Sequence, residues 1–177
     1  TRNAAAGYED GMLTVGAETV GSYRVVGASA FAGAVLADEV IVTATAGATD
    51  TTVTTSLNVA VEGVGNINGG AGQFSDGKTE FNLSLALDGT TFGGTFARFQ
   101  NGGNGAKSQS FSGLLTQLDG GGFDASVPQD LVGTVTTGDV SVAVDQLFDV
   151  VIDANALTII GGRAEWSFAN MSSTIHY

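Results

Sequence analysis

The chain has 177 residues, of which 43% are hydrophobic and 14% are charged. This length and hydrophobic content indicate one folded domain with a sizeable core and exclude a disordered chain, even with 27 glycines. The charged fraction is well below the usual ~25%, so the surface must consist largely of Thr, Ser, Asn, Gln and Gly. Such a glycine-rich, weakly charged surface is typical of secreted and surface-displayed β-proteins.

The charge balance is acidic, with 18 Asp and Glu against 6 Lys and Arg and a net charge of −12. Phosphate binding needs clustered basic side chains, and here they are scattered along the sequence, which argues against nucleic acid as a partner. The absence of cysteine excludes disulfides, thiolate catalysis and cysteine-ligated zinc. No run approaches the ~20 apolar residues of a membrane-spanning helix, so no transmembrane segment is predicted. Thr1 in place of methionine indicates either a trimmed initiator or a removed signal peptide.

In chain order, residues 1–11 are predicted to form an N-terminal arm, and residues 12–177 a single β domain. Residues 28–37 are rich in Ala and Gly and fit either a helical turn or a tight strand. Residues 39–45 are rich in β-branched side chains, which favours a strand. Residues 51–62 alternate apolar and polar side chains with a period of two, which predicts a half-buried strand.

Three two-residue turn signals predict tight hairpins between β-prone runs: Asp88-Gly89, Gly138-Asp139 and Gly161-Gly162. In each hairpin the register that the turn demands also places the apolar side chains on one face, and a one-residue slip would scatter them. The predicted pairs are Leu87–Thr90, Leu85–Phe92, Leu83–Gly94 and Phe81–Phe96 in the first hairpin, Val135–Val142 in the second, and Leu157–Trp166 and Ile159–Ala164 in the third. Gly94 then either makes room for Leu83 or allows a close approach of backbone.

Three glycine-rich or polar stretches are predicted as loops, namely residues 63–77, 101–107 and 119–130, and residues 110–118 are predicted as a strand. Long loops often carry function. The strand-like segments number about ten to twelve and recur at the spacing of sandwiches and barrels, with no convincing helix. The sequence therefore predicts an all-β antiparallel fold, either a β-sandwich or a Greek-key, jelly-roll-like barrel.

The sequence offers little catalytic chemistry. Its only histidine is His176, and no Gly-x-Ser-x-Gly elbow occurs, which argues against a hydrolytic triad. Glycosidase chemistry needs two convergent carboxylates, whereas most carboxylates here lie at outward strand positions. We therefore expect neither an enzyme nor an organic cofactor. Asp119 and Asp124 are candidates for binding calcium, which prefers carboxylate oxygens, although turn formation by Asp and Gly is the simpler explanation.

The two ends of the chain are the elements most available for exchange with a neighbouring subunit. Polar, Ala-rich arms such as residues 1–7 normally fray unless something holds them in place. We therefore predict contacts between subunits from both ends of the chain, at Thr1, Arg2, Asn3, Tyr8, Trp166, Phe168 and Tyr177.

Two short stretches resemble known surface proteins. Phe92-Gly93-Gly94 and Phe111-Ser112-Gly113 resemble strand ends in the C-terminal barrels of transferrin-binding-type surface lipoproteins, although the lipid-bearing cysteine is absent. The closing segment from Gly162 to Tyr177 resembles the C-terminal strand of chaperone–usher pilins, although the usual pilin disulfide is missing. Each resemblance covers a small part of the chain, so no functional residue is carried over.

These features together predict a non-enzymatic structural subunit, extracellular or at the cell surface, with a virion as the alternative location. It is expected to self-assemble into a filament, coat or virion-like shell through its termini and β edges, as a homo-oligomer or polymer. The alternative is a ligand- or glycan-binding surface module whose rim is formed by the three predicted loops.

Overall fold

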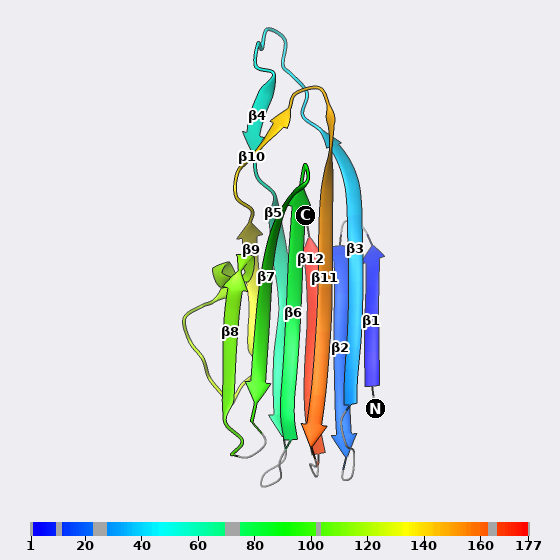
Figure 1. The fold of residues 1–177 in the computed structure, drawn as a ribbon, viewed down its shortest axis with the longest axis vertical. Coiled ribbons are helices and arrows are strands. Elements are labelled where there is room, and N and C mark those ends of the chain that lie inside the picture. Colours follow the sequence, from blue (N-terminus) through cyan, green and yellow to red (C-terminus); the bar gives the residue numbers. More distant parts are fainter. Residues whose placement is uncertain are drawn as a thin grey trace.

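The computed structural model describes residues 2–9, 12–22, 28–69, 75–101, 104–162 and 166–176. Over these residues the chain folds into two five-stranded antiparallel sheets and a two-stranded ribbon at one end (Figure 1). The two sheets pack face to face and enclose a common hydrophobic core. The predicted all-β antiparallel sandwich is confirmed.

The first sheet has the strand order β1-β2-β12-β5-β9, and the second sheet has the order β3-β11-β6-β7-β8. The first sheet consists of β1 (Arg2–Glu9), β2 (Met12–Ser22), β12 (Trp166–His176), β5 (Asn58–Gly69) and β9 (Gln129–Thr136). The second sheet consists of β3 (Ala28–Ile41), β11 (Leu147–Gly162), β6 (Ser75–Leu87), β7 (Thr90–Gln100) and β8 (Lys107–Gly113). The ribbon pairs β4 (Thr52–Thr55) with β10 (Val140–Ala143), and a 3₁₀ helix, η1 (Leu114–Leu118), follows β8.

The core lies between the two sheets, because alternate side chains of each strand turn inward. Phe81, Leu83 and Phe96 from the second sheet and Val59 and Leu131 from the first are all buried in one cluster. Burying one such side chain contributes about 1.5–3 kcal/mol. A one-residue slip of any strand would forfeit that contribution, so the inward pattern fixes the register.

The hairpin at Asp88-Gly89 forms as the sequence predicts. Both turn residues have positive φ, 47° and 74°, as a two-residue type I′ turn requires. β6 and β7 pair in the predicted register, with Leu83 opposite Gly94. Of the two explanations for Gly94, the close approach of backbone is correct, because a Cβ at this position would lie 2.6 Å from the backbone nitrogen of Leu115.

The hairpin predicted at Gly138-Asp139 is wrong. Val142 pairs with Val53 of β4, and Val135 pairs with Val59 of β5. The chain therefore continues through Gly138-Asp139 beside one long partner segment instead of turning back on itself. Pairing with residues far away in the sequence replaces the local turn.

The hairpin predicted at Gly161-Gly162 is also wrong. β11 runs through both glycines and stays paired with β6. Leu157 pairs with residues of β3 and β6, not with Trp166, while Ala164, the predicted partner of Ile159, lies outside the described residues. Trp166 begins β12 in the first sheet. The chain changes sheets between β11 and β12, so the two strands are not hydrogen-bonded neighbours.

Several boundaries also differ from the prediction. Residues 2–9, expected within an arm, form β1 and pair with β2. Residues 28–37 lie in a strand, β3. Residues 63–69 and 75–77 of one expected loop belong to β5 and β6. Residues 114–118, expected within a strand, form η1.

The predicted strand over residues 51–62 is interrupted at residues 56–57, which separate β4 from β5. The strand predicted over residues 39–45 is confirmed only as far as Ile41, where β3 ends. The loop predicted over residues 119–130 is confirmed for residues 119–128.

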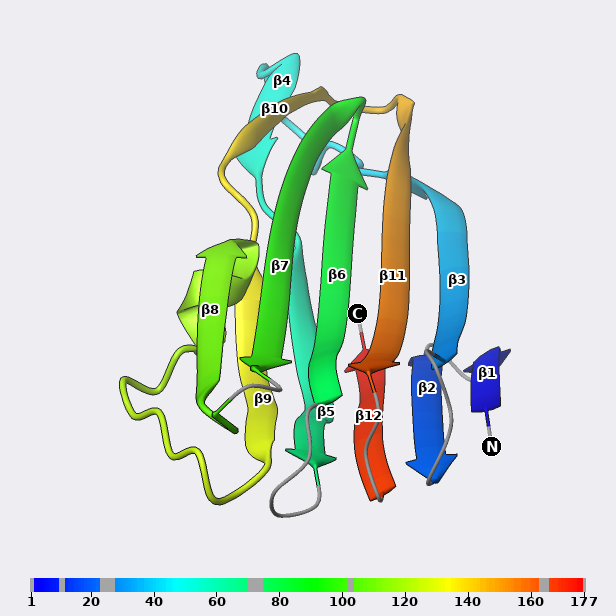
Figure 2. The ribbon, with the colours of Figure 1, turned by 60° about the horizontal axis from the view of Figure 1, so that its bottom comes forward.

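The two sides of the sandwich differ (Figure 2). At one side, η1 and the loop of residues 119–128 connect β8 to β9, and η1 packs three leucines into the core. At the other side, β1 and β3 are the last strands of their sheets, and no described residue pairs with their outer edges. β8 and β9 are also the last strands of their sheets, but η1 and the loop link them, whereas no described segment directly links β1 to β3. We call the side of β1 and β3 the open side.

Candidate functional site

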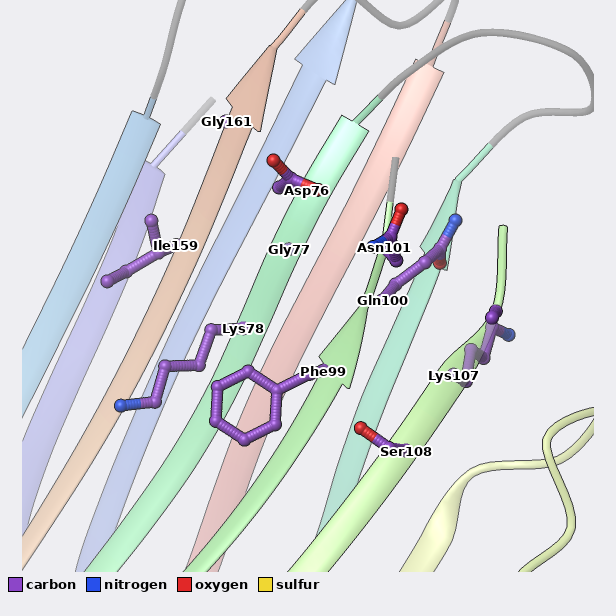
Figure 3. A pocket seen from close by; sticks show the side chains of 11 residues that line it. Asp76, Gly77, Lys78, Phe99, Gln100, Asn101, Lys107, Ser108, Ile159 and Gly161 are labelled. Carbon is purple, nitrogen blue, oxygen red and sulfur yellow. The ribbon is translucent and has the colours of Figure 1, made fainter. Parts of the chain in front are cut away.

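A groove of about 490 Å³ lies on the second sheet, near the ends of β6, β7 and β8 (Figure 3). Its floor is a row of direct cross-strand neighbours that runs across four strands, from Ile159 through Lys78 and Phe99 to Ser108. Asp76 and other residues at the strand ends complete the lining. Because the row alternates apolar and polar side chains, the groove offers both an aromatic ring and hydrogen-bonding groups.

The charge of Lys78 on the groove floor is compensated by Glu80, two residues further along β6. Lys78 forms an ion pair with Glu80, and its ammonium lies 5.5 Å from the centre of the Phe99 ring. Partial burial by itself raises the pKa of Glu80, but hydrogen bonds from Asn82 and Lys78 and the Lys78 charge outweigh it, so the pKa lies below its ordinary value. Glu80 is therefore ionised at neutral pH, and it holds Lys78 along the floor.

Beside the groove, two cations of β7 and β8 hold the loop of residues 119–128. Arg98 donates from Nη2 to the backbone oxygen of Asp124 (2.9 Å), and Lys107 donates from Nζ to the backbone oxygen of Ala125 (3.0 Å). The Arg98 guanidinium also lies 5.5 Å from the ring centre of Phe123. These contacts attach the loop to the sheet through its backbone, so the attachment does not depend on the loop's carboxylates.

The Arg98 side chain is only 1% exposed. Removing its charged guanidinium from water costs free energy. Burial lowers the pKa of Arg98, although the charge of Asp124 acts in the opposite direction. Burial and the Arg98 charge also lower the pKa of Lys107. Arg98 Nε, Gln100 Oε1 and Gln109 Oε1 are buried without a hydrogen-bond partner. This end of the interior is therefore polar and less stabilised than the leucine-rich centre.

The predicted inter-subunit residues fall on two strands of the first sheet. Arg2, Asn3 and Tyr8 lie on β1, at the open side. Trp166 and Phe168 lie on β12, which is paired on one edge with β2 and on the other with β5. Because both edges of β12 are occupied, its backbone cannot accept a strand from a neighbour. Thr1 and Tyr177 lie outside the described residues.

The two calcium candidates each organise a turn. Asp119 accepts a hydrogen bond from the backbone N–H of Gly121 (3.1 Å), and Asp124 accepts from the backbone N–H (2.7 Å) and hydroxyl (2.6 Å) of Ser126. These two bonds are the main reason that the pKa of Asp124 lies below its ordinary value. Within the described part of the chain, no group of three or more His, Asp or Glu side chains is placed to hold a metal ion.

The carboxylates whose side chains the structure describes lie towards solvent. Every Asp and Glu whose side chain the structure describes is at least partly exposed. A glycosidase-like acid needs a carboxyl group whose pKa is raised by its surroundings, whereas the surroundings of Glu80 and of Asp124 lower the pKa of each.

The sequence predicts the loops around the groove but not the groove itself. Its lining includes Asp76 from the predicted loop 63–77 and Asn101 from the predicted loop 101–107. The buried position of Arg98 was also missed. A signal was present, because Arg98 shares the period-two inward pattern of β7 with Phe96.

No family model, no curated protein and no solved structure matches this chain. Of the helices among the described residues, none has the length and apolar character needed to cross a bilayer.

Proposed function

We propose that this chain is a non-enzymatic structural subunit of the cell exterior, which assembles with copies of itself into a filament, coat or shell. The observation that carries the proposal is the open side, where β1 and β3 end their sheets with unpaired outer edges. An unpaired edge presents a row of N–H and C=O groups to a strand of another molecule. Copies of the chain can therefore extend each other's sheets.

The two edge strands lack the residues that normally prevent such pairing. Neither β1 nor β3 contains proline or lysine, with which natural proteins protect their sheet edges. Their charged residues lie towards the strand ends, at Arg2, Glu9, Asp38 and Glu39. The middle of each strand is rich in Ala and Gly, which leaves the backbone accessible to a partner.

Exposed apolar side chains add contact area near the open side. Phe31 and Val35 of β3 are 60% and 62% exposed on the outward face of the second sheet. Two such residues on one face of an edge strand suit burial by a neighbouring subunit. The weakly charged composition supports an extracellular location, and the net charge of −12 would keep finished assemblies apart.

Light scattering and electron microscopy of the purified protein at increasing concentration test this proposal. We expect a mass above that of the monomer that rises with concentration, and particles with a regular repeat. Val35→Lys, on an exposed face of β3, should reduce assembly, whereas Thr91→Lys, exposed on β7 away from the open side, should not. A protein that stays monomeric up to its solubility limit contradicts the proposal.

A second candidate function, saccharide binding, is favoured by the groove. Phe99 is 40% exposed there, and it is surrounded by ammonium, carboxylate, amide and hydroxyl groups. A sugar ring has one apolar face, which suits an aromatic ring, and hydroxyl groups around its edge, which suit the polar lining.

Retention on a glycan array tests this second function. Phe99→Ala should abolish retention of any bound glycan, whereas Phe31→Ala, which removes another exposed ring of the same sheet, should preserve it. Equal retention by both variants, or no retention by the wild type, would show that the groove is not a saccharide site.

A further inference from the structure

We infer that β1 pairs with β1 of a second copy of this chain, antiparallel and about a two-fold axis, so that the two first sheets become one. The inference rests on the proposed self-assembly and names the strand and the register that would carry it. It selects β1 from the two edges of the open side, and it places Arg2 of each copy opposite Tyr8 of the other.

The position of β1 favours it over β3. In both views β1 lies farther out than β3 at the open side (Figure 1, Figure 2). β3 lies against β1 and β2 across the sandwich, so a second copy that approaches the part of β3 beside β1 meets β1 first, although β3 is the longer strand and extends past β1 (Figure 1). A partner that pairs with β1 meets no such obstacle, because the outer edge of β1 faces solvent along its described length.

The side chains of β1 are incompletely covered by their own chain. Ala4, Ala6 and Tyr8 lie opposite residues of β2 that are buried in the core, so they are on the core-facing side of the first sheet. Nevertheless all side chains of residues 2–8 are exposed, and Tyr8 is 53% exposed. The core-facing side chains of β1 thus lie beyond the part of the first sheet that β3 buries. A second copy would bury them.

The sequence of β1 is complementary to itself when the two-fold axis passes through Ala5. Ala4 then lies opposite Ala6 of the second copy, and Arg2 lies opposite Tyr8 at both ends, where a guanidinium can stack on an aromatic ring. A shift by one residue turns the core-facing side chains outward. A shift by two residues leaves Arg2 without an aromatic partner.

The charge of the chain predicts how this pairing depends on salt. Each copy carries a net charge of −12, so two copies repel each other over distances that salt screens. The contact itself is made by backbone groups, alanines and a cation–aromatic pair. We therefore expect the dimer to be favoured by added salt, in contrast to an interface held by ion pairs.

Cysteine cross-linking tests the register directly, because the natural chain has no cysteine. In the inferred register Ala5 lies opposite Ala5 of the second copy, with Cα atoms about 4.5–5.5 Å apart, which is within the range that a disulfide spans. Ala5→Cys should therefore form a disulfide-linked dimer on mild oxidation. Asn3→Cys, also exposed on β1, should not, because its nearest neighbour is Gly7 of the second copy.

The outcomes separate this inference from the proposed function. Dimers of Ala5→Cys but not of Asn3→Cys, seen on non-reducing gels and strengthened by salt, support the inferred register. If the wild type assembles while Ala5→Cys fails to cross-link, or if Ala6→Cys cross-links instead, the inferred register is wrong and the proposed function stands. If the wild type is monomeric at every concentration and salt level, both fail. Thermal melting of the reduced variants confirms that they are folded.

Discussion

Thr19 of β2 and Thr158 of β11 share a hydrogen bond of 2.6 Å between their Oγ1 atoms, and both side chains are fully buried. The bond joins the two sheets near the C-terminal ends of β2 and β11. Thr19→Val or Thr158→Val leaves one hydroxyl buried without a partner and should lower the free energy of unfolding by about 1–3 kcal/mol. The double variant removes both hydroxyls, so we expect it to be nearly as stable as the wild type. Chemical denaturation in a double-mutant cycle measures this, and simple additivity of the two losses would contradict it.

Gly94 and Gly93 are adjacent in β7 but should respond differently to substitution. A Cβ at Gly94 would lie 2.6 Å and 2.9 Å from the backbone nitrogens of Leu115 and Leu114, whereas a Cβ at Gly93 has its nearest neighbour at 4.0 Å. Gly94→Ala should therefore push η1 away from the sheet and cost about 1–3 kcal/mol. Gly93→Ala is the matched control and should be tolerated. Equal midpoints of thermal unfolding for the two variants would refute the close-approach explanation.

Arg98→Met tests how the loop of residues 119–128 is held. Replacing a buried charged group by an apolar side chain of similar size is often nearly neutral, so we expect the global free energy of unfolding to change by about 1 kcal/mol or less. The loop, however, loses its bond to Arg98 and the contact between Arg98 and Phe123. Limited proteolysis should therefore cut within this loop faster than in the wild type. Lys78→Met, which removes a cation that contacts Glu80 and Phe99 instead of the loop, should leave the cleavage rate unchanged.

The ion pair between Lys78 and Glu80 predicts a dependence on pH. Hydrogen bonds and the Lys78 charge, acting against partial burial, depress the pKa of Glu80 in the folded protein below its ordinary value of 4.5. The stabilisation is therefore complete above the ordinary pKa and is lost as the pH falls through the folded pKa. Lys78→Met should raise the pKa of Glu80 and weaken the loss of stability on acidification. An NMR titration of the Glu80 carboxyl group measures the shift, and an unchanged pKa would exclude this cause.

The hairpin at Asp88-Gly89 was predictable because all of its determinants are local. Both turn residues take up positive φ, and the flanking strands place Leu83 and Leu85 in the core in the register that the turn imposes. The turn and the alternation of side chains predict the same register, and the distant strand β11 pairs with the other edge of β6 without displacing β7. Local signals decide the structure in this part of the chain.

At Gly138-Asp139 the same local signals give the wrong structure. The backbone N–H of Thr137 donates to the oxygen of Leu57 (3.0 Å), and Thr137 Oγ1 accepts from the N–H of Leu57 (2.9 Å). These bonds hold the segment beside a partner that is remote in the sequence, so the chain does not turn. The alternation of apolar and polar residues around Val135 and Val142 predicts only that both side chains are buried. It does not predict which strand lies beside each of them.

The candidate sites were predictable only in part. The loops around the groove follow from glycine and polar composition, but the row that forms its floor joins Ile159 to Lys78 and Phe99, from three strands whose order in the sheet cannot be read from a single sequence. Similarly, contacts made by Arg2 and Tyr8 with a neighbour were predicted from the composition of the N-terminal segment. That these residues lie on an edge strand depends on the pairing of β1 with β2.

The place of β12 between β2 and β5 has a consequence for biogenesis. The ribosome makes β12 after both of its neighbours, so a growing polypeptide holds β2 and β5 with a gap between them until residues 166–176 emerge. Until then one edge of β2 and one edge of β5 have unpaired backbone N–H and C=O groups, which makes the chain prone to aggregate. β12, which is made after both of its neighbours, completes the sheet. We expect chains truncated before residue 166 to depend on chaperones.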